Sequence, residues 1–147
     1  MTKKDLQSYA GIKKEITQIE GAIRELSARV YSPRAPQLTG LPGAASTQRG
    51  SAQERAATEL FELREHYEEK IRELYARRLQ IERAIDELPE ELERVILRAH
   101  YIDGQTWERT CITASVGWGT VHEWHRKALR ELAKNPYTFV HSRVVQY

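Results

Sequence analysis

Polar side chains that could bind a ligand gather between residues 118 and 130 of this 147-residue chain. His122 and His125 stand three positions apart, which would put two imidazoles on one side of a helix. A zinc site needs three or four such ligands, and the sequence offers neither a third ligand nor an HExxH pattern. We therefore expect no metal site. These histidines, with a glutamate and three basic residues around them, instead suit hydrogen bonding to double-stranded DNA.

A helix over residues 118–132 would separate these polar residues from an apolar side. The inward positions keep helical period and are Val121, Trp124, Ala128, Leu129 and Leu132. The outward positions, which we predict to contact DNA, are Trp118, Gly119, Thr120, His122, Glu123, His125, Arg126, Lys127 and Arg130. Side chains in the first turns of such a helix reach base edges, whereas basic residues further along bind phosphates and fix the register.

Individual roles follow from the chemistry of each side chain. Glu123 could accept a hydrogen bond from cytosine N4, and His122 could donate one to guanine. Gly119 would let a phosphate or backbone approach closely. Arg126 and Lys127, joined by Arg130, suit phosphate oxygens.

The preceding residues supply the other parts of a helix-turn-helix. Residues 107–114 are predicted to form its first helix, capped by Thr106, with Cys111 at the small buried position against the second helix. Residues 115–117 make the turn. A helix over residues 89–102 provides the floor of the core, and Asp103-Gly104 is a turn signal after it.

The first part of the chain predicts a long antiparallel helical hairpin. Apolar residues between 5 and 30 follow one another at alternating intervals of three and four, the heptad rhythm of a helix packed along another helix. Residues 31–50 hold three of the five prolines and are expected to form a loop. Ser51 with Glu54 fits a capping box that opens a second helix ending near Leu88. Such seamed helices favour a homodimer.

Composition excludes several classes of protein. The net charge of +2 does not by itself indicate a nucleic-acid binder. No apolar run is long enough to span a membrane, and the first residues lack a signal peptide, so we expect a cytoplasmic protein without membrane contact. The single cysteine excludes a disulfide framework. Because no nucleophile arrangement, phosphate-cradling loop or isolated carboxylate pair is present, we expect neither catalysis nor a cofactor.

Several residues between 92 and 132 recur in a known pattern. They are Arg94-Val95, Tyr101, Gly104, Thr106-Trp107-Glu108, Val116, Thr120-Val121 and Ala128-Leu129-Arg130-Glu131-Leu132. Together they resemble the fourth region of bacterial sigma factors, which implies a promoter-binding helix-turn-helix. Ser115 stands where that pattern usually has a glycine, and Gly117 where it usually has a capping serine.

The N-terminal part adds Ser32-Pro33, Leu38-Thr39-Gly40-Leu41-Pro42-Gly43 and a long helix rich in Glu and Arg. With the sigma-like ending, these features resemble the late-transcription regulators of the ArpU/RinA type, found in phages of Gram-positive bacteria. The resemblance implies an activator of late, packaging-related genes in the bacterial host, with DNA and RNA polymerase as partners.

The sequence therefore predicts an all-α protein, with a long antiparallel helical hairpin at residues 1–88 and a sigma-like DNA-binding unit at 89–134, followed by a tail at 135–147. Two alternatives stay open. The small subunit of a phage terminase also joins a helix-turn-helix to oligomerising helices, but it assembles as a ring. The chain could also be a helical protein-interaction module that does not bind DNA.

Overall fold

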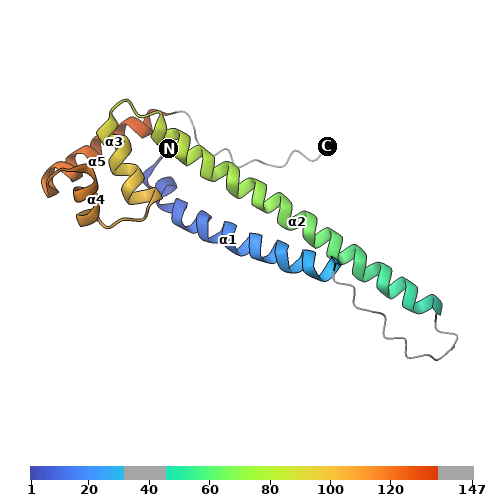
Figure 1. Cartoon of the computed structure of the whole chain (residues 1–147). Helices are drawn as coiled ribbons and strands as arrows, with labels where there is room; N and C mark the ends of the chain where they lie inside the picture. The colour runs from blue at the N-terminus through green and yellow to red at the C-terminus, as the bar shows by residue number, and fades with distance from the viewer. Residues whose placement is uncertain (32–45, 136–147) are drawn as a thin grey trace. The chain divides into compact units, whose positions relative to one another are not determined.

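The computed structural model describes residues 1–31 and 46–135, and every regular element in these two ranges is helical (Figure 1). The elements are α1 (Lys3–Tyr31), α2 (Ser46–Asp86), α3 (Glu91–Leu97), the π-helical turn η1 (Arg98–Ile102), α4 (Trp107–Ala114) and α5 (Trp118–Ala133). The predicted all-α class, a pair of long helices followed by short ones, is confirmed. Most of the predicted loop at 31–50, and the tail from residue 136, lie outside the described residues.

Helix α2 begins at Ser46, five residues before its predicted start. Ser51 and Glu54 therefore lie inside the helix, and the predicted capping box is wrong. The residues before Ser51 include no proline back to position 46, so no missing backbone donor stops the helix there. Gly50 weakens the helix by about 1 kcal/mol but does not end it.

The chain divides into two compact units. The larger comprises Met1–Glu15 and the part of the chain from Leu74 onward, and the smaller is Ile16–Glu73. Both long helices continue from one unit into the other. This division differs from the predicted boundary at residue 88, because the beginning of α1 and the last turns of α2 belong to the same unit as the three short helices.

In the larger unit, the beginning of α1 and the end of α2 contribute to one core. Leu6, Tyr9 and Ile12 of α1 are buried, as are Ile81 and Ile85 of α2. Removing each of these apolar side chains from water contributes on the order of 1.5–3 kcal/mol. The heptad spacing read from the sequence thus marks the buried side of α1 in this unit, where Tyr9 and Ile12 are buried.

A polar cluster links the same two helices. The Tyr9 hydroxyl donates a hydrogen bond to a Glu82 carboxylate oxygen and accepts one from Nε of Arg78 at 3.1 Å. Arg78 and Glu82 also form an ion pair at 3.5 Å along α2. Burial, followed by the hydrogen bond to Glu82, raises the pKa of Tyr9. Tyr9 therefore stays protonated and fixes α1 against α2.

The smaller unit holds the end of α1 and the first part of α2. Ile16 and Leu26 of α1 are buried. Along α2, residues 51–59 are exposed throughout, and Leu60 is the first residue of this helix whose described side chain is partly buried. An ion pair between Arg64 and Glu68 at 3.1 Å supports α2 within this unit.

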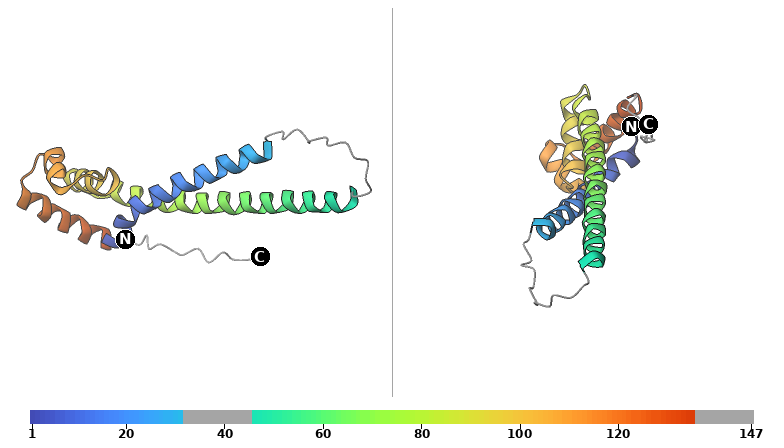
Figure 2. Two further views of the ribbon diagram at one scale, coloured as in Figure 1. Left: turned by 90° about the horizontal axis from the view of Figure 1, so that it is seen from below. Right: turned by 90° about the vertical axis from the view of Figure 1, so that its right-hand side faces the viewer.

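The three short helices α3, α4 and α5 lie together in the larger unit (Figure 2) and contribute buried side chains to its core. Ile96 and Leu97 of α3 are fully buried, and so are Val121, Ala128 and Leu132 of α5. Leu132 closes this core near the end of α5. Among the described residues, no helix is both long enough and apolar enough to cross a membrane.

Candidate nucleic-acid interface

Helices α4 and α5 form the predicted helix-turn-helix, and the bounds of α4 are as expected at Trp107–Ala114. Gly104 has φ of +69°, which allows the chain to reverse after η1. The Thr106 hydroxyl accepts a hydrogen bond from the backbone N–H of Arg109 at 3.2 Å, so the predicted cap of α4 is confirmed. The turn at Gly104 and the cap at Thr106, both within a few residues of α4, therefore suffice to predict where this helix begins.

The turn between α4 and α5 depends on one residue in an uncommon conformation. Ser115 has φ of 55° and ψ of 40°, the left-handed region that favours glycine. The backbone N–H of Val116 donates to the carbonyl of Cys111 at 3.0 Å and so closes the end of α4. Helix α5 then begins at Trp118 after Gly117, which offers no side-chain cap.

We expect Ser115→Gly to raise the free energy of unfolding by about 1 kcal/mol, because glycine adopts the left-handed conformation without the steric cost of a Cβ. The urea concentration at the unfolding midpoint measures this change. Glu108→Gly, at an exposed right-handed position of α4, is the matched control and should lower stability by about 1 kcal/mol. A loss of stability on Ser115→Gly would contradict the geometry of this turn.

One side of α5 is exposed over its first three turns. Trp118 is 56% exposed, and Gly119, Thr120, Glu123 and Arg126 are exposed as well. Arg130 is exposed one turn further along, whereas His122 and Lys127 are partly buried. Eight of the nine residues predicted to contact DNA thus reach the surface of the described structure to some degree.

His125 is the exception, and its predicted outward orientation is wrong. Its side chain is buried, and Nε2 lies 2.8 Å from the Tyr101 hydroxyl. Burial, with the nearby charge of Lys3, lowers the pKa of His125 to about 4. Burial also raises the pKa of Tyr101. Both side chains are therefore uncharged near neutral pH and satisfy each other, which allows a polar residue to occupy a core position.

Trp124, predicted to occupy the core, is only partly buried. The ammonium of Lys127 lies 4.4 Å from the centre of the Trp124 ring, a distance at which a cation is attracted to the ring face. The indole therefore supports a basic side chain on the surface, instead of filling the space that His125 takes.

A chain of aromatic rings connects the exposed end of α5 to this buried histidine. Trp107 stacks on His100 with ring centres 3.8 Å apart, and it meets the edge of His125 at 4.7 Å. His122 lies 4.9 Å from Trp107 and 4.7 Å from Trp118. Helical spacing predicts each helix but not this cluster, because its rings come from η1, α4 and α5 and meet only through contacts between these elements.

The small residue that lets α4 approach its neighbours is Thr110 and not Cys111. Thr110 is fully buried, whereas Cys111 is partly exposed, so the prediction for Cys111 is wrong. The Thr110 hydroxyl donates to the carbonyl of Thr106 at 2.9 Å, and this bond inside the helix removes the cost of burying a polar group.

A buried carboxylate lies behind the basic side of α5. Glu93 of α3 has no exposed surface, and neither of its oxygens has a hydrogen-bond partner within the described ranges. Burial raises the pKa of Glu93, while the positive charge of Lys127 acts in the opposite direction. Lys127 therefore lies within the electrostatic influence of Glu93 as well as against the Trp124 ring.

The backbone near Gly119 leaves room for a ligand to approach. A methyl group added at Gly119 or at Gly117 would meet no heavy atom within 4 Å. Neither glycine is therefore required by packing inside the chain. The open space at Gly119 is what close approach of a phosphate would need.

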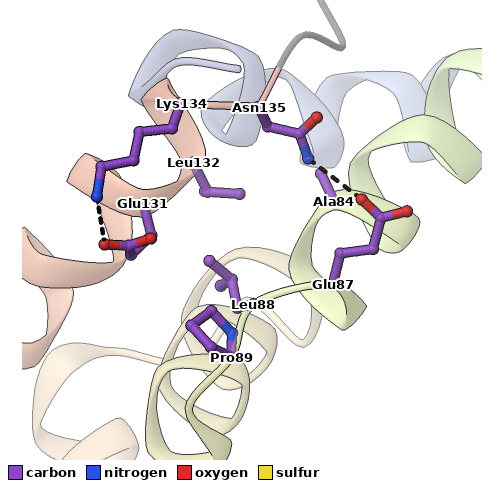
Figure 3. Close-up of a pocket in the computed structure, with 8 residues that line it drawn as sticks. All are labelled: Ala84, Glu87, Leu88, Pro89, Glu131, Leu132, Lys134 and Asn135. Atoms are coloured by element: carbon purple, nitrogen blue, oxygen red, sulfur yellow. Dashed lines mark hydrogen bonds and ion pairs between the residues drawn. The ribbon is translucent and has the colours of Figure 1, made fainter.

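A shallow pocket of about 270 Å³ lies at the opposite end of α5, between this helix and the end of α2 (Figure 3). The amide of Asn135 donates a hydrogen bond to Glu87 at 3.4 Å across it, and Lys134 pairs with Glu131 at 2.8 Å beside it. The bond between Asn135 and Glu87 joins the residues just after α5 to those just after α2, while the first turns of α5 stay exposed. Among the described residues, no group of three or more metal-ligating side chains is gathered here or elsewhere.

Comparison with known protein families identifies a match over much of the chain. The model of the family DUF1492, described as a protein of unknown function, matches residues 45–133. No curated protein and no solved structure matches the chain. The matched region covers more than half of the chain and extends from the beginning of α2 to the end of α5, so it includes the complete helix-turn-helix. The chain therefore belongs to the DUF1492 family.

Proposed function

We propose that this protein binds double-stranded DNA through α5 and regulates transcription. The observation that carries the proposal is a helix-turn-helix whose second helix buries Val121, Ala128 and Leu132 and leaves the polar side of its first turns open to solvent. In helix-turn-helix proteins that bind DNA, the polar side of the second helix ordinarily lies in the major groove.

The exposed residues divide into base-reading and phosphate-binding groups. Trp118, Gly119 and Glu123 belong to the first two turns and would lie nearest the base edges. Arg126 and Lys127 follow them and would bind phosphates, which orient the protein without reading sequence. His125 has no direct role in this arrangement, since it holds Tyr101 inside the core.

The sigma-like pattern and the resemblance to ArpU/RinA regulators extend this proposal. They favour an activator of phage late genes that works in the cytoplasm of the bacterial host, contacts RNA polymerase and binds as a homodimer. Dimerisation suits a single reading head of this size, because one small helix-turn-helix binds DNA weakly by itself.

Selection of bound duplexes from a random-sequence pool tests the proposal, because such a pool contains every short operator. We expect enrichment of one motif, and complexes with that motif that weaken by on the order of 10³-fold or more between 50 and 200 mM salt. The same measurement on a scrambled duplex is the control. Absence of both an enriched motif and a salt-sensitive complex would reject DNA binding and favour a protein-interaction module.

A further inference from the structure

Helix α2 carries a row of side chains that DNA binding does not use. Six positions, alternately four and three residues apart, make up this row, here called the α2 stripe: Phe61, Glu65, Glu68, Arg72, Tyr75 and Leu79. At about 100° per residue, all six fall within about 40° of Phe61 around the helix axis. Because α2 is one uninterrupted helix, its own period places them on one face.

The α2 stripe is open to solvent at its apolar and its charged positions. Phe61 is 61% exposed, Tyr75 43% and Leu79 46%. Between them, Glu65 and Arg72 are exposed, and the side chain of Glu68 is 42% exposed although it pairs with Arg64. Large apolar side chains repeated along one helix face in this way indicate a surface that another helix covers.

The order of residues along the α2 stripe makes it complementary to itself. In an antiparallel pair of stripes centred on position 70, Phe61 of one copy faces Leu79 of the other, Glu65 faces Tyr75, and Glu68 faces Arg72. A two-fold axis repeats each of these contacts, so no like charges oppose each other. Moving the register by half a heptad, so that Phe61 faces Arg72, would instead oppose Glu65 and Glu68.

We propose that two copies of this chain form a two-fold dimer through the α2 stripe, antiparallel and centred on position 70. The apolar ends contribute buried area, while Glu68 and Arg72 select the register at some cost in stability. The stripe is about 27 Å long. A contact of this length should bury less surface than a standard protein–protein interface, so the dimer should form reversibly. This proposal holds whether or not the chain binds DNA.

The charge pair gives a test that separates association from folding. Glu68→Arg alone and Arg72→Glu alone each place like charges opposite each other twice per dimer, and each should weaken association by about tenfold or more. A mixture of the two single variants restores both opposite-charge pairs, but only between unlike chains. We therefore expect each variant to sediment as a monomer by itself and the mixture to sediment as a dimer.

Sedimentation velocity over a concentration series, with circular dichroism as a check of helix content, measures these outcomes. Glu73→Arg, at an exposed position on another face of α2, is the matched control and should dimerise like the original chain. Phe61→Ala should weaken the dimer without a change of charge. A monomeric original chain, an assembly of more than two copies, single variants that still dimerise, or a mixture that stays monomeric would each overturn the proposal.

Discussion

Acidification from pH 6.5 to pH 4 is expected to lower the free energy of unfolding by about 3 kcal/mol through His125 alone. The pKa of this imidazole falls from 6.5 to about 4 in the folded protein because the side chain is buried. Between pH 6.5 and pH 4, the unfolded chain therefore binds a proton at His125, whereas the folded chain does not. The contribution of His125 to the free energy of unfolding is fully present above pH 6.5 and is lost progressively as the pH falls to 4.

Urea unfolding at a series of pH values measures this loss, and His125→Gln isolates it. The variant should be less stable at pH 7, since it loses the contact with Tyr101, but its stability should decline less steeply between pH 6.5 and 4. His100, whose pKa is also lowered by burial, adds a loss of the same sign that remains in the variant. Glu93 acts in the opposite direction, because its raised pKa favours the folded state as the pH falls. Equal slopes for the two proteins would contradict the burial of His125.

Replacing both Arg126 and Lys127 with alanine is expected to weaken DNA binding by roughly 10- to 100-fold for each bound subunit and to reduce the salt slope by about two per subunit, hence by about four for a homodimer. Each side chain is assigned one phosphate, and each neutralised phosphate contributes about one unit to the slope of affinity against salt. Because phosphates carry no base identity, the loss should be similar for the selected motif and for a scrambled duplex. Titrations at several salt concentrations measure both quantities.

The matched control replaces two exposed basic residues of α2, Arg55 and Lys70, with alanine. It removes the same charge from the chain, so a general electrostatic effect would weaken binding equally in both variants. Lys127 also offsets the buried charge of Glu93, and the fraction of folded protein should therefore be verified before affinities are compared. Unchanged affinity and slope in the Arg126 and Lys127 variant would show that this side of α5 does not contact phosphates.

The helix boundaries around the proposed interface were predictable because the signals are local. Thr106 caps α4 by its own hydroxyl, and Gly104 supplies a positive φ, so each residue type determines its own geometry. The predicted burial of Val121, Ala128 and Leu132 is correct, because apolar residues at helical spacing lie on one face of the helix and that face packs against the core.

The errors share a different cause. The apolar pattern counts Trp124 as a core residue and His125 as a surface residue, yet the structure buries the histidine. The deciding contact is with Tyr101, 24 positions earlier in the chain, and a polar group is buried readily once such a partner is present. Thr110 was missed for the same reason, since a hydrogen bond within α4 satisfies its hydroxyl. Nothing in spacing alone reveals these partners.

The π-helical turn η1 has a consequence for how members of the DUF1492 family vary. In this turn the N–H of Asp103 donates to the carbonyl of Arg98, five positions earlier, whereas in an α-helix it would donate to the carbonyl four positions earlier. The turn Arg98–Ile102 therefore contains one residue more than an α-helical turn. A relative with a single deletion here would form a regular turn and rotate the counterpart of Tyr101 by about 100° around the helix. Evolutionary loss of that one residue should therefore coincide with replacement of the histidine at position 125 by an apolar side chain.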